Sequence, residues 1–133
     1  MSASAGKAPF HAHIYYTAES RATALALHQR LTQAMDSGAI AELLFVGAMR
    51  DRALGPHPIP EFEIHFTQAM VPAVTAMLEA SGLTALVHPL TDDDVADHTT
   101  LAHWIGPALP LKLDTLDPPG FNQGMARFGK SDF

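Results

Sequence analysis

Hydrophobic and polar residues alternate along two short segments of the chain, 10–16 (FHAHIYY) and 61–66 (EFEIHF). Successive side chains of a β-strand point to opposite faces of a sheet, so this period of two predicts two strands. A continuous apolar run at 41–49 (AELLFVGAM) predicts a buried strand. A short fourth strand is expected at 84–88, where Pro89 ends it.

Two further segments repeat apolar residues at three- and four-residue spacing, which predicts amphipathic helices. The first runs from about Ser20 to Ser37, with Ser20 as its cap and Gly38 just beyond its end. The second spans 71–81 and ends at Gly82. The resulting order βαββαβ is the ferredoxin-like pattern, an α+β fold with both helices on one face of an antiparallel sheet.

The opposite face of such a sheet is bare, and pairing two bare faces forms a closed dimeric α/β barrel. We therefore expect a homodimer, unless the C-terminal segment folds over that face instead. The length fits one domain at 1–133, with a flexible N-terminus at 1–9 and a C-terminal extension at 107–133.

Beyond the fourth strand the pattern is weaker. The acidic residues 92–94 favour a helix start, and 95–105 is expected to form that helix. Leucines alternate along 109–113, but a proline among them confines any strand there to a sheet edge. The tail at 117–133 contains many turn residues and three phenylalanines, so we expect it to be irregular and anchored at points.

Composition narrows the function. The net charge of −6, with only 8 Lys and Arg, provides no basic surface for nucleic acid. No apolar run is long enough for a membrane helix, and no signal-peptide pattern opens the chain, so a cytoplasmic protein is expected. Cysteine is absent, so any metal must be bound by imidazole and carboxylate. The chain has 8 His, spread from position 11 to position 103, and this excess requires an explanation.

Histidines and carboxylates gather on the face opposite the predicted helices. The two alternating strands are expected to be neighbours, about 4.8 Å apart. Their polar side chains then point together: His11, His13, Tyr15, Glu61, Glu63 and His65. His88, at the end of the fourth strand, can join them with a local rotation. Several imidazoles and a carboxylate with open positions form the kind of site that non-heme Fe(II) oxygenases use.

Four motifs in order, HAHIYY, GPHP, LVHP before DDDVADHT, and HWIG, resemble the DOPA 4,5-dioxygenase family over roughly residues 10–113. The resemblance implies a ferredoxin-like dimeric α/β barrel and the opening of a catechol ring by dioxygen at a non-heme iron. The chain differs from the family pattern at Asp92, where glycine is common. The family's recurrent histidines correspond to His11, His13, His57, His88 and His98.

These observations assign candidate roles. We expect His11, His13, His88 and Glu63 to bind Fe(II), with Zn as a possible substitute. His57, held between two prolines, and His98 are candidate acid–base groups, since imidazole titrates near neutral pH. Tyr15 is expected to orient a substrate oxygen. We interpret His28 and His103 as structural or surface residues. His65 shares the polar face but belongs to none of the motifs, so we do not assign it as a ligand. The acidic run Asp92–Asp94 is interpreted as a helix start.

Two other functions remain open. One is a zinc-dependent or cofactor-free enzyme that acts on a small aromatic or cyclic acid, with His57 as the general base. The other is a dimeric module that binds a small ligand without catalysis. The fold alone cannot choose among these functions. The number of converging histidines can, because a cavity that only binds a ligand does not need three imidazoles close enough to share an ion.

Overall fold

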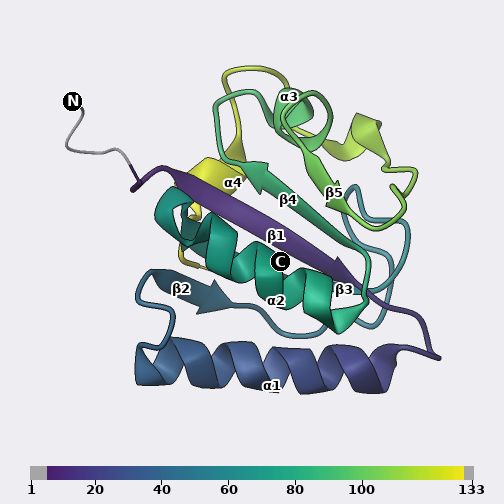
Figure 1. Cartoon of the computed structure of the whole chain (residues 1–133). Coiled ribbons are helices and arrows are strands. Elements are labelled where there is room, and N and C mark those ends of the chain that lie inside the picture. Colours follow the sequence, from purple (N-terminus) through teal and green to yellow (C-terminus); the bar gives the residue numbers. More distant parts are fainter. Residues whose placement is uncertain (1–5, 131–133) are drawn as a thin grey trace.

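A single antiparallel sheet organises the chain, with strand order β2-β3-β1-β4-β5. The computed structural model describes residues 6–130. In chain order its strands and α-helices are β1 Pro9–Tyr15, α1 Arg21–Ser37, β2 Leu43–Val46, β3 Glu61–Thr67, α2 Val71–Ser81, β4 Ala85–Pro89, α3 Asp94–His98, β5 His103–Ile105 and α4 Gln123–Ala126. The first and third strands lie at the centre of the first four, as the sequence predicts, and the sheet is open (Figure 1).

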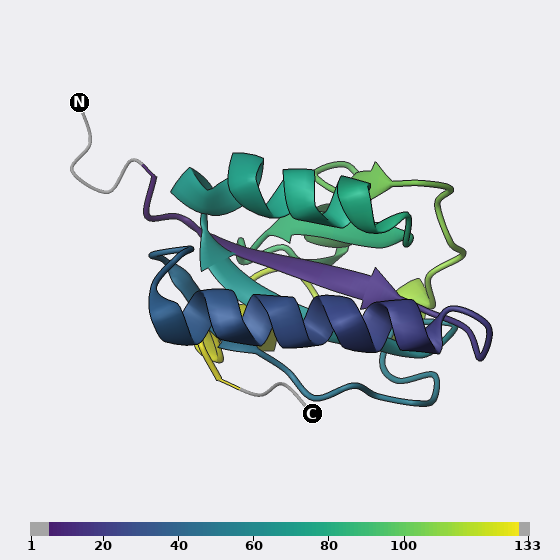
Figure 2. The same cartoon turned by 60° about the horizontal axis from the view of Figure 1, so that its bottom comes forward.

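The apolar set of the alternating strands faces α1 and α2, which lie side by side on one face of the sheet (Figures 1 and 2). Antiparallel pairing sets Ala12 opposite Ile64 and Ile14 opposite Phe62, and all four side chains are fully buried. Both helices end where predicted, at glycines with φ of 77° and 76°, a left-handed conformation that side chains with a Cβ disfavour. Hydrophobic burial therefore determines which face of the sheet the helices cover.

The chain after β4 differs from the prediction. The helix expected at 95–105 is wrong: α3 has only five residues, and His103–Ile105 forms β5, which pairs with β4. A strand there forms hydrogen bonds with the backbone groups of β4 that β1 leaves unpaired. These hydrogen bonds depend on a distant segment, so the local periodicity of 95–105 could not predict them. The edge strand expected at 109–113 is also absent; a 3₁₀ turn at Leu113–Thr115 follows irregular chain.

The expected strand at 41–49 is shorter in the structure. β2 covers Leu43–Val46, with a register shift between Leu43 and Phe45. Beyond it, Gly47 and Arg50 continue to donate backbone hydrogen bonds to β3. The segment thus follows β3 beyond the end of regular pairing.

The N-terminal stretch expected to be flexible is only partly described. Residues 1–5 lie outside the described part of the chain. Gly6 and Ala8 accept backbone hydrogen bonds from Ala69 and Gln68, so this stretch is attached to the turn after β3.

The C-terminal segment 116–130, named here the strap, lies on the sheet face opposite α1 and α2 (Figures 1 and 2). Phe128 stacks on His11 and His65, with ring centroids 6.4 and 5.9 Å apart. The amide of Gly129 donates to His65 Nδ1 at 2.9 Å. We expected a homodimer because this face of the sheet would be bare, but the strap covers part of it. The homodimer therefore stays a prediction, and a bare sheet face no longer supports it.

Within residues 6–130, no helix combines the length and the apolar character needed to cross a bilayer.

Candidate metal centre

The polar faces of β1, β3 and β4 bring histidines together because of strand register. His11 lies opposite His65 on β3 and opposite His88 on β4, so all three rings share one face. His88 needs no local rotation to reach this face. Residues from the loop before β3 and from α3 complete a set of six buried histidines: His11, His13, His57, His65, His88 and His98.

His13 and His88 meet at the middle of this set. Their Nε2 atoms are 3.0 Å apart. His88 Nδ1 donates to the carbonyl of Pro89 at 2.8 Å, so in the neutral ring Nε2 carries a lone pair. His13 Nδ1 lies 2.9 Å from Glu61 Oε1, and donation to this carboxylate leaves a lone pair on its Nε2 as well. Two lone pairs at this distance repel each other unless a cation binds both.

His11 supplies a third nitrogen. Its Nε2 is buried and has no hydrogen-bond partner within residues 6–130. His11, His13 and His88 each offer one ligand atom within 4.8 Å of the others. Nitrogens that bind one ion at about 2.1 Å lie roughly 3 Å apart. The nitrogens of His13 and His88 have this separation, so the trio is a candidate site for a divalent metal. The second ring nitrogens of His13 and His88 bond to a carboxylate and a carbonyl, as is usual for metal-bound histidines.

Two other groups also satisfy the distance criterion, His11–Glu63–His65 and His13–His57–Glu61. In the first, His65 Nδ1 accepts from Gly129, so its proton is on Nε2, which donates to Glu63 at 2.8 Å. A neutral His65 therefore has no lone pair left for a metal. In the second, the carboxylate of Glu61 faces the nitrogen of His13 that carries the proton.

Burial keeps the imidazoles of the centre neutral. It is the main cause that lowers the pKa of His11, His13, His57 and His88 well below the usual value, and neighbouring imidazoles add to the effect. A neutral imidazole is the form that binds a metal. The electrostatics of the cluster therefore favour ligation at neutral pH.

A cavity of about 330 Å³ opens onto the cluster. This volume lies within the roughly 300–1,000 Å³ of small-molecule sites. His11, His13, His57, His88 and His98 line one side of it. The other side comes from the strap and the residue before it, with Thr115, Leu116, Asp117, Gln123, Gly124 and Arg127. The cavity lies between the sheet and the C-terminal segment and can admit a small molecule to the imidazoles.

His57 lines the cavity from the loop between β2 and β3. The start of the loop is held by Asp51, which accepts from Tyr16 at 2.6 Å and from Arg21 at 2.9 Å. Near the histidine, Pro56 accepts from the amide of Lys112 at 2.8 Å. These contacts, together with the flanking prolines, fix the position of the ring.

Tyr15 contacts His57 and is not among the cavity-lining residues. Its hydroxyl lies 2.7 Å from His57 Nδ1, and its ring stacks on Trp104. Burial, followed by the charge of Glu61, raises the pKa of Tyr15 strongly, so the phenol keeps its proton. The geometry favours an action of Tyr15 through His57 over direct contact with a substrate.

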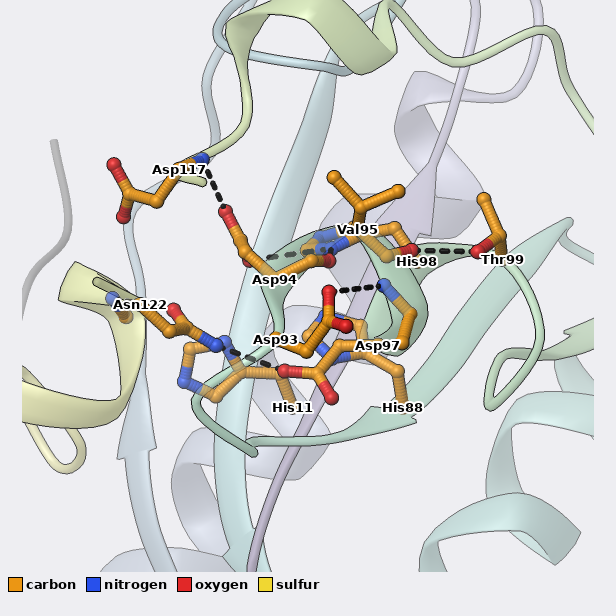
Figure 3. Close-up of polar contacts among 12 residues, drawn as sticks. His11, His88, Asp93, Asp94, Val95, Asp97, His98, Thr99, Asp117 and Asn122 are labelled. Atoms are coloured by element: carbon orange, nitrogen blue, oxygen red, sulfur yellow. Dashed lines mark hydrogen bonds and ion pairs between the residues drawn. The ribbon is translucent and has the colours of Figure 1, made fainter. Parts of the chain in front are cut away.

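His98 reaches the cavity from α3. Its Nδ1 donates to the carbonyl of Asp94 at 2.7 Å, and the Asp94 carboxylate lies 3.4 Å away (Figure 3). Asp94 also accepts from the amide of Asp117 at 3.0 Å. Burial alone would raise the pKa of Asp94, but these hydrogen bonds outweigh burial and lower it. α3 is thus linked to the strap beside the cavity.

A second link joins α3 to the strap. Asn122 donates from Nδ2 to the carbonyl of Thr91 at 2.6 Å. The same nitrogen donates to Asp97 at 2.8 Å (Figure 3). Asp97 also accepts from the hydroxyl of Thr91 at 2.7 Å. Asp94 and Asp97 therefore do more than form a short helix, because their carboxylates hold the strap beside the cavity.

The remaining candidates are distributed as follows. Glu63 is buried next to His11 and His65, and among residues 6–130 no group of candidate ligand atoms joins it to His13 and His88. His28 Nε2 donates to the carbonyl of Gly47 at 2.8 Å, on the helical side of the sheet, in agreement with a structural role. His103 is exposed on β5.

Sequence reasoning placed Glu61 on the shared polar face but chose Glu63 as the ligand, and it missed Asp94 and the strap as parts of the site. Glu61 has the same alternation as Glu63, so the pattern did not distinguish them. Asp94 and the strap have no periodicity that points to the cluster, and only their hydrogen bonds reveal the connection.

Known proteins are similar to this chain in sequence and in fold. The profile of the "Dopa 4,5-dioxygenase family" matches residues 10–115. A DOPA 4,5-dioxygenase of Amanita muscaria is 32% identical over 112 residues, which cover 80% of this chain and 49% of that protein. An uncharacterized 21.2 kDa protein of Botryotinia fuckeliana is 38% identical over 73 residues, 47% of this chain and 40% of that protein. The chain thus spans half or less of these curated relatives.

A crystal structure from Nostoc punctiforme, described as a "putative dioxygenase", superposes with a TM-score of 0.66 at 30% identity. The alignment covers 86% of this chain and 96% of that one. Since the profile match includes β1, the His57 loop, β3, β4 and α3, it contains all six buried histidines. The chain therefore belongs to the DOPA 4,5-dioxygenase family.

Proposed function

We propose that this protein is a non-heme Fe(II) dioxygenase of the extradiol type, which opens the ring of a catechol such as DOPA with dioxygen. The observation that carries the proposal is the convergence of His11, His13 and His88, whose ligand nitrogens lie within 4.8 Å of one another and which line a cavity. The names of the relatives support an oxygenase reaction, and the metal and the substrate are our inference.

The proposed ligands are His11, His13 and His88. Bound Fe(II) would supply a Lewis acid that acidifies two adjacent catechol hydroxyls, and a redox centre for reaction with dioxygen. Glu63, the fourth ligand expected from the sequence, lies beside His11, and we propose that it supports this ring. Zn is a possible substitute in the same trio, without the redox chemistry.

His57 is the proposed base. It lines the cavity, and its lowered pKa keeps it unprotonated at neutral pH. If Nδ1–H donates to the Tyr15 oxygen, the Nε2 lone pair is left to take a hydroxyl proton from the substrate. Glu61 Oε1, 3.7 Å from this Nε2, would stabilise the proton once it is there. His98, with Nδ1 held by Asp94, presents Nε2 as a second group that can transfer protons.

Iron content tests the ligand set. The protein is purified under nitrogen, loaded with Fe(II), desalted and analysed for bound iron. We expect His13→Ala to lose most of the metal, because it removes the nitrogen 3.0 Å from His88. The matched control is His103→Ala, an exposed histidine on β5 that should keep the iron content of the wild type. Undiminished iron in His13→Ala would remove this residue from the ligand set.

Oxygen uptake tests the reaction. A panel of catechols, including DOPA, is added to the iron-loaded protein, and oxygen consumption and a yellow ring-opened product are recorded. Uptake and colour in the wild type, both lost in His13→Ala, are the expected result. Iron binding without uptake across the panel would favour an enzyme of another class or a ligand-binding module.

A homodimeric barrel of the ferredoxin-like type and a cytoplasmic location are further parts of the proposal. The strap covers part of the face that a barrel would enclose, so a dimer needs other contacts, such as the open edges β2 and β5. Light scattering after size-exclusion chromatography measures the oligomeric state, and fractionation of the producing cells measures the location.

A further inference from the structure

We propose that Glu61 is a positioning residue of the metal centre: its carboxylate holds the proton of His13 on Nδ1, so that Nε2 presents a lone pair toward His11 and His88. This inference rests on the proposed function, because it gives Glu61 a purpose only if a cation binds there. It assigns to Glu61 a role that the alternating pattern of β3 does not single out.

The position of Glu61 makes its burial unusual. It is the first residue of β3 and lies opposite Tyr15 in the register with β1. Its backbone exchanges two hydrogen bonds with Arg50, at 2.8 and 3.1 Å, and its side chain is fully buried. A carboxylate in this environment loses its hydration, and such burial is costly unless polar groups compensate.

Two imidazoles lie near Glu61 Oε1. This atom lies 2.9 Å from His13 Nδ1 and 3.7 Å from His57 Nε2. It therefore stands between a proposed ligand and the proposed base. Because an ionised carboxylate can only accept hydrogen bonds, the contact selects the His13 tautomer with the proton on Nδ1.

His88 shows the same arrangement with a different acceptor. The carbonyl of Pro89 fixes its proton on Nδ1. A carbonyl cannot be removed by substitution, whereas Glu61 can be replaced. The two acceptors together leave both facing Nε2 atoms unprotonated, 3.0 Å apart, where only a shared cation makes the approach favourable. Of the two acceptors that keep these Nε2 atoms free for a metal, Glu61 is thus the one that a substitution can remove.

The tautomer of His13 in metal-free wild-type protein is the first test. Long-range ¹H–¹⁵N correlation spectra distinguish Nδ1–H from Nε2–H in each imidazole. We expect His13 to carry its proton on Nδ1. A proton on Nε2 would overturn the proposal, and this measurement depends neither on a variant nor on iron or activity.

Metal affinity of Glu61→Gln is the second test, measured with Co(II) by competition against a chromophoric chelator. Loss of such a supporting contact weakens metal binding by about 10–100-fold, and we expect a loss in that range, accompanied by a mixed or Nε2–H tautomer of His13. The matched control is Asp97→Asn, which also replaces a fully buried carboxyl by an amide, but at a carboxyl that accepts hydrogen bonds from Thr91 and Asn122.

The outcomes separate the two hypotheses. Equal affinity in Glu61→Gln and wild type would overturn the role of Glu61, and so would an equal loss in Asp97→Asn, which would indicate a general effect of neutralising a buried acid. If wild-type protein shows the Nδ1–H tautomer and binds Co(II) but consumes no oxygen with any catechol, the role of Glu61 stands and the oxygenase proposal fails. If Glu61→Gln does not fold, the wild-type tautomer decides.

Discussion

Acidification should destabilise the metal-free protein strongly, because the folded state keeps its buried imidazoles neutral. His11, His13, His57 and His88 all have a pKa well below the usual value, with burial as the main cause. In the unfolded chain each returns to about 6.5. Below that pH the unfolded state binds more protons than the folded state, so stability falls as the pH falls.

The size of the effect follows from the same linkage. Between pH 7.5 and 5.5, one histidine that stays neutral in the folded state and titrates near 6.5 when unfolded costs about 1.4 kcal/mol. Four such residues give an upper limit of roughly 5 kcal/mol. Small proteins have total stabilities of about 5–15 kcal/mol, so the loss is a large fraction of the whole.

Urea denaturation of the metal-free protein at the two pH values measures this difference. We expect stability to be nearly constant above about pH 7 and to decrease below about 6.5. His57→Gln should lose about 1.4 kcal/mol less over the same interval, whereas the exposed His103→Gln should behave as the wild type. A total change below about 1 kcal/mol would refute the argument that burial holds the imidazoles neutral.

Three further predictions concern separate parts of the molecule. Ile64→Ala, on the helical face of β3, should cost about 2–5 kcal/mol in urea denaturation and leave the pH dependence unchanged; an altered pH dependence would show that the two faces are coupled. Tyr15→Phe removes the hydroxyl 2.7 Å from His57, so we expect kcat for catechol cleavage to fall with little change in KM, and a pure KM effect would place the hydroxyl on the substrate instead. Phe128→Ala removes the ring stacked on His65 and should speed hydrogen exchange at the amide of Gly129; unchanged exchange would mean that other contacts hold the strap.

Membership of the family says more about the fold of this protein than about the reaction it catalyses. The curated DOPA 4,5-dioxygenase has about twice the length that this chain matches. The cavity wall from the strap lies after residue 115, the last residue that the family profile matches. Residues outside the match to the family profile therefore line part of the cavity.

Local patterns were enough to predict the framework of the sheet. Alternation along 10–16 and 61–66 has a period of two, and each such strand had to place one set of side chains in the core, so the histidines of β1 and the acids of β3 were assigned to a common face correctly. The helix ends at Gly38 and Gly82 follow from backbone conformation alone. After His88 the periodicity is short and interrupted, and the helix expected at 95–105 was wrong because pairing with β4 outweighed local preference.

What the sequence by itself determined was therefore which side chains share a face, because this depends only on the period of each strand. Tertiary structure alone decided which nitrogens meet: the 3.0 Å approach of His13 and His88 depends on the register between β1 and β4, and the cavity depends on the strap folding over the sheet. Register and strap position arise from contacts between residues far apart in the chain, and no local pattern of hydrophobic and polar positions contains that information.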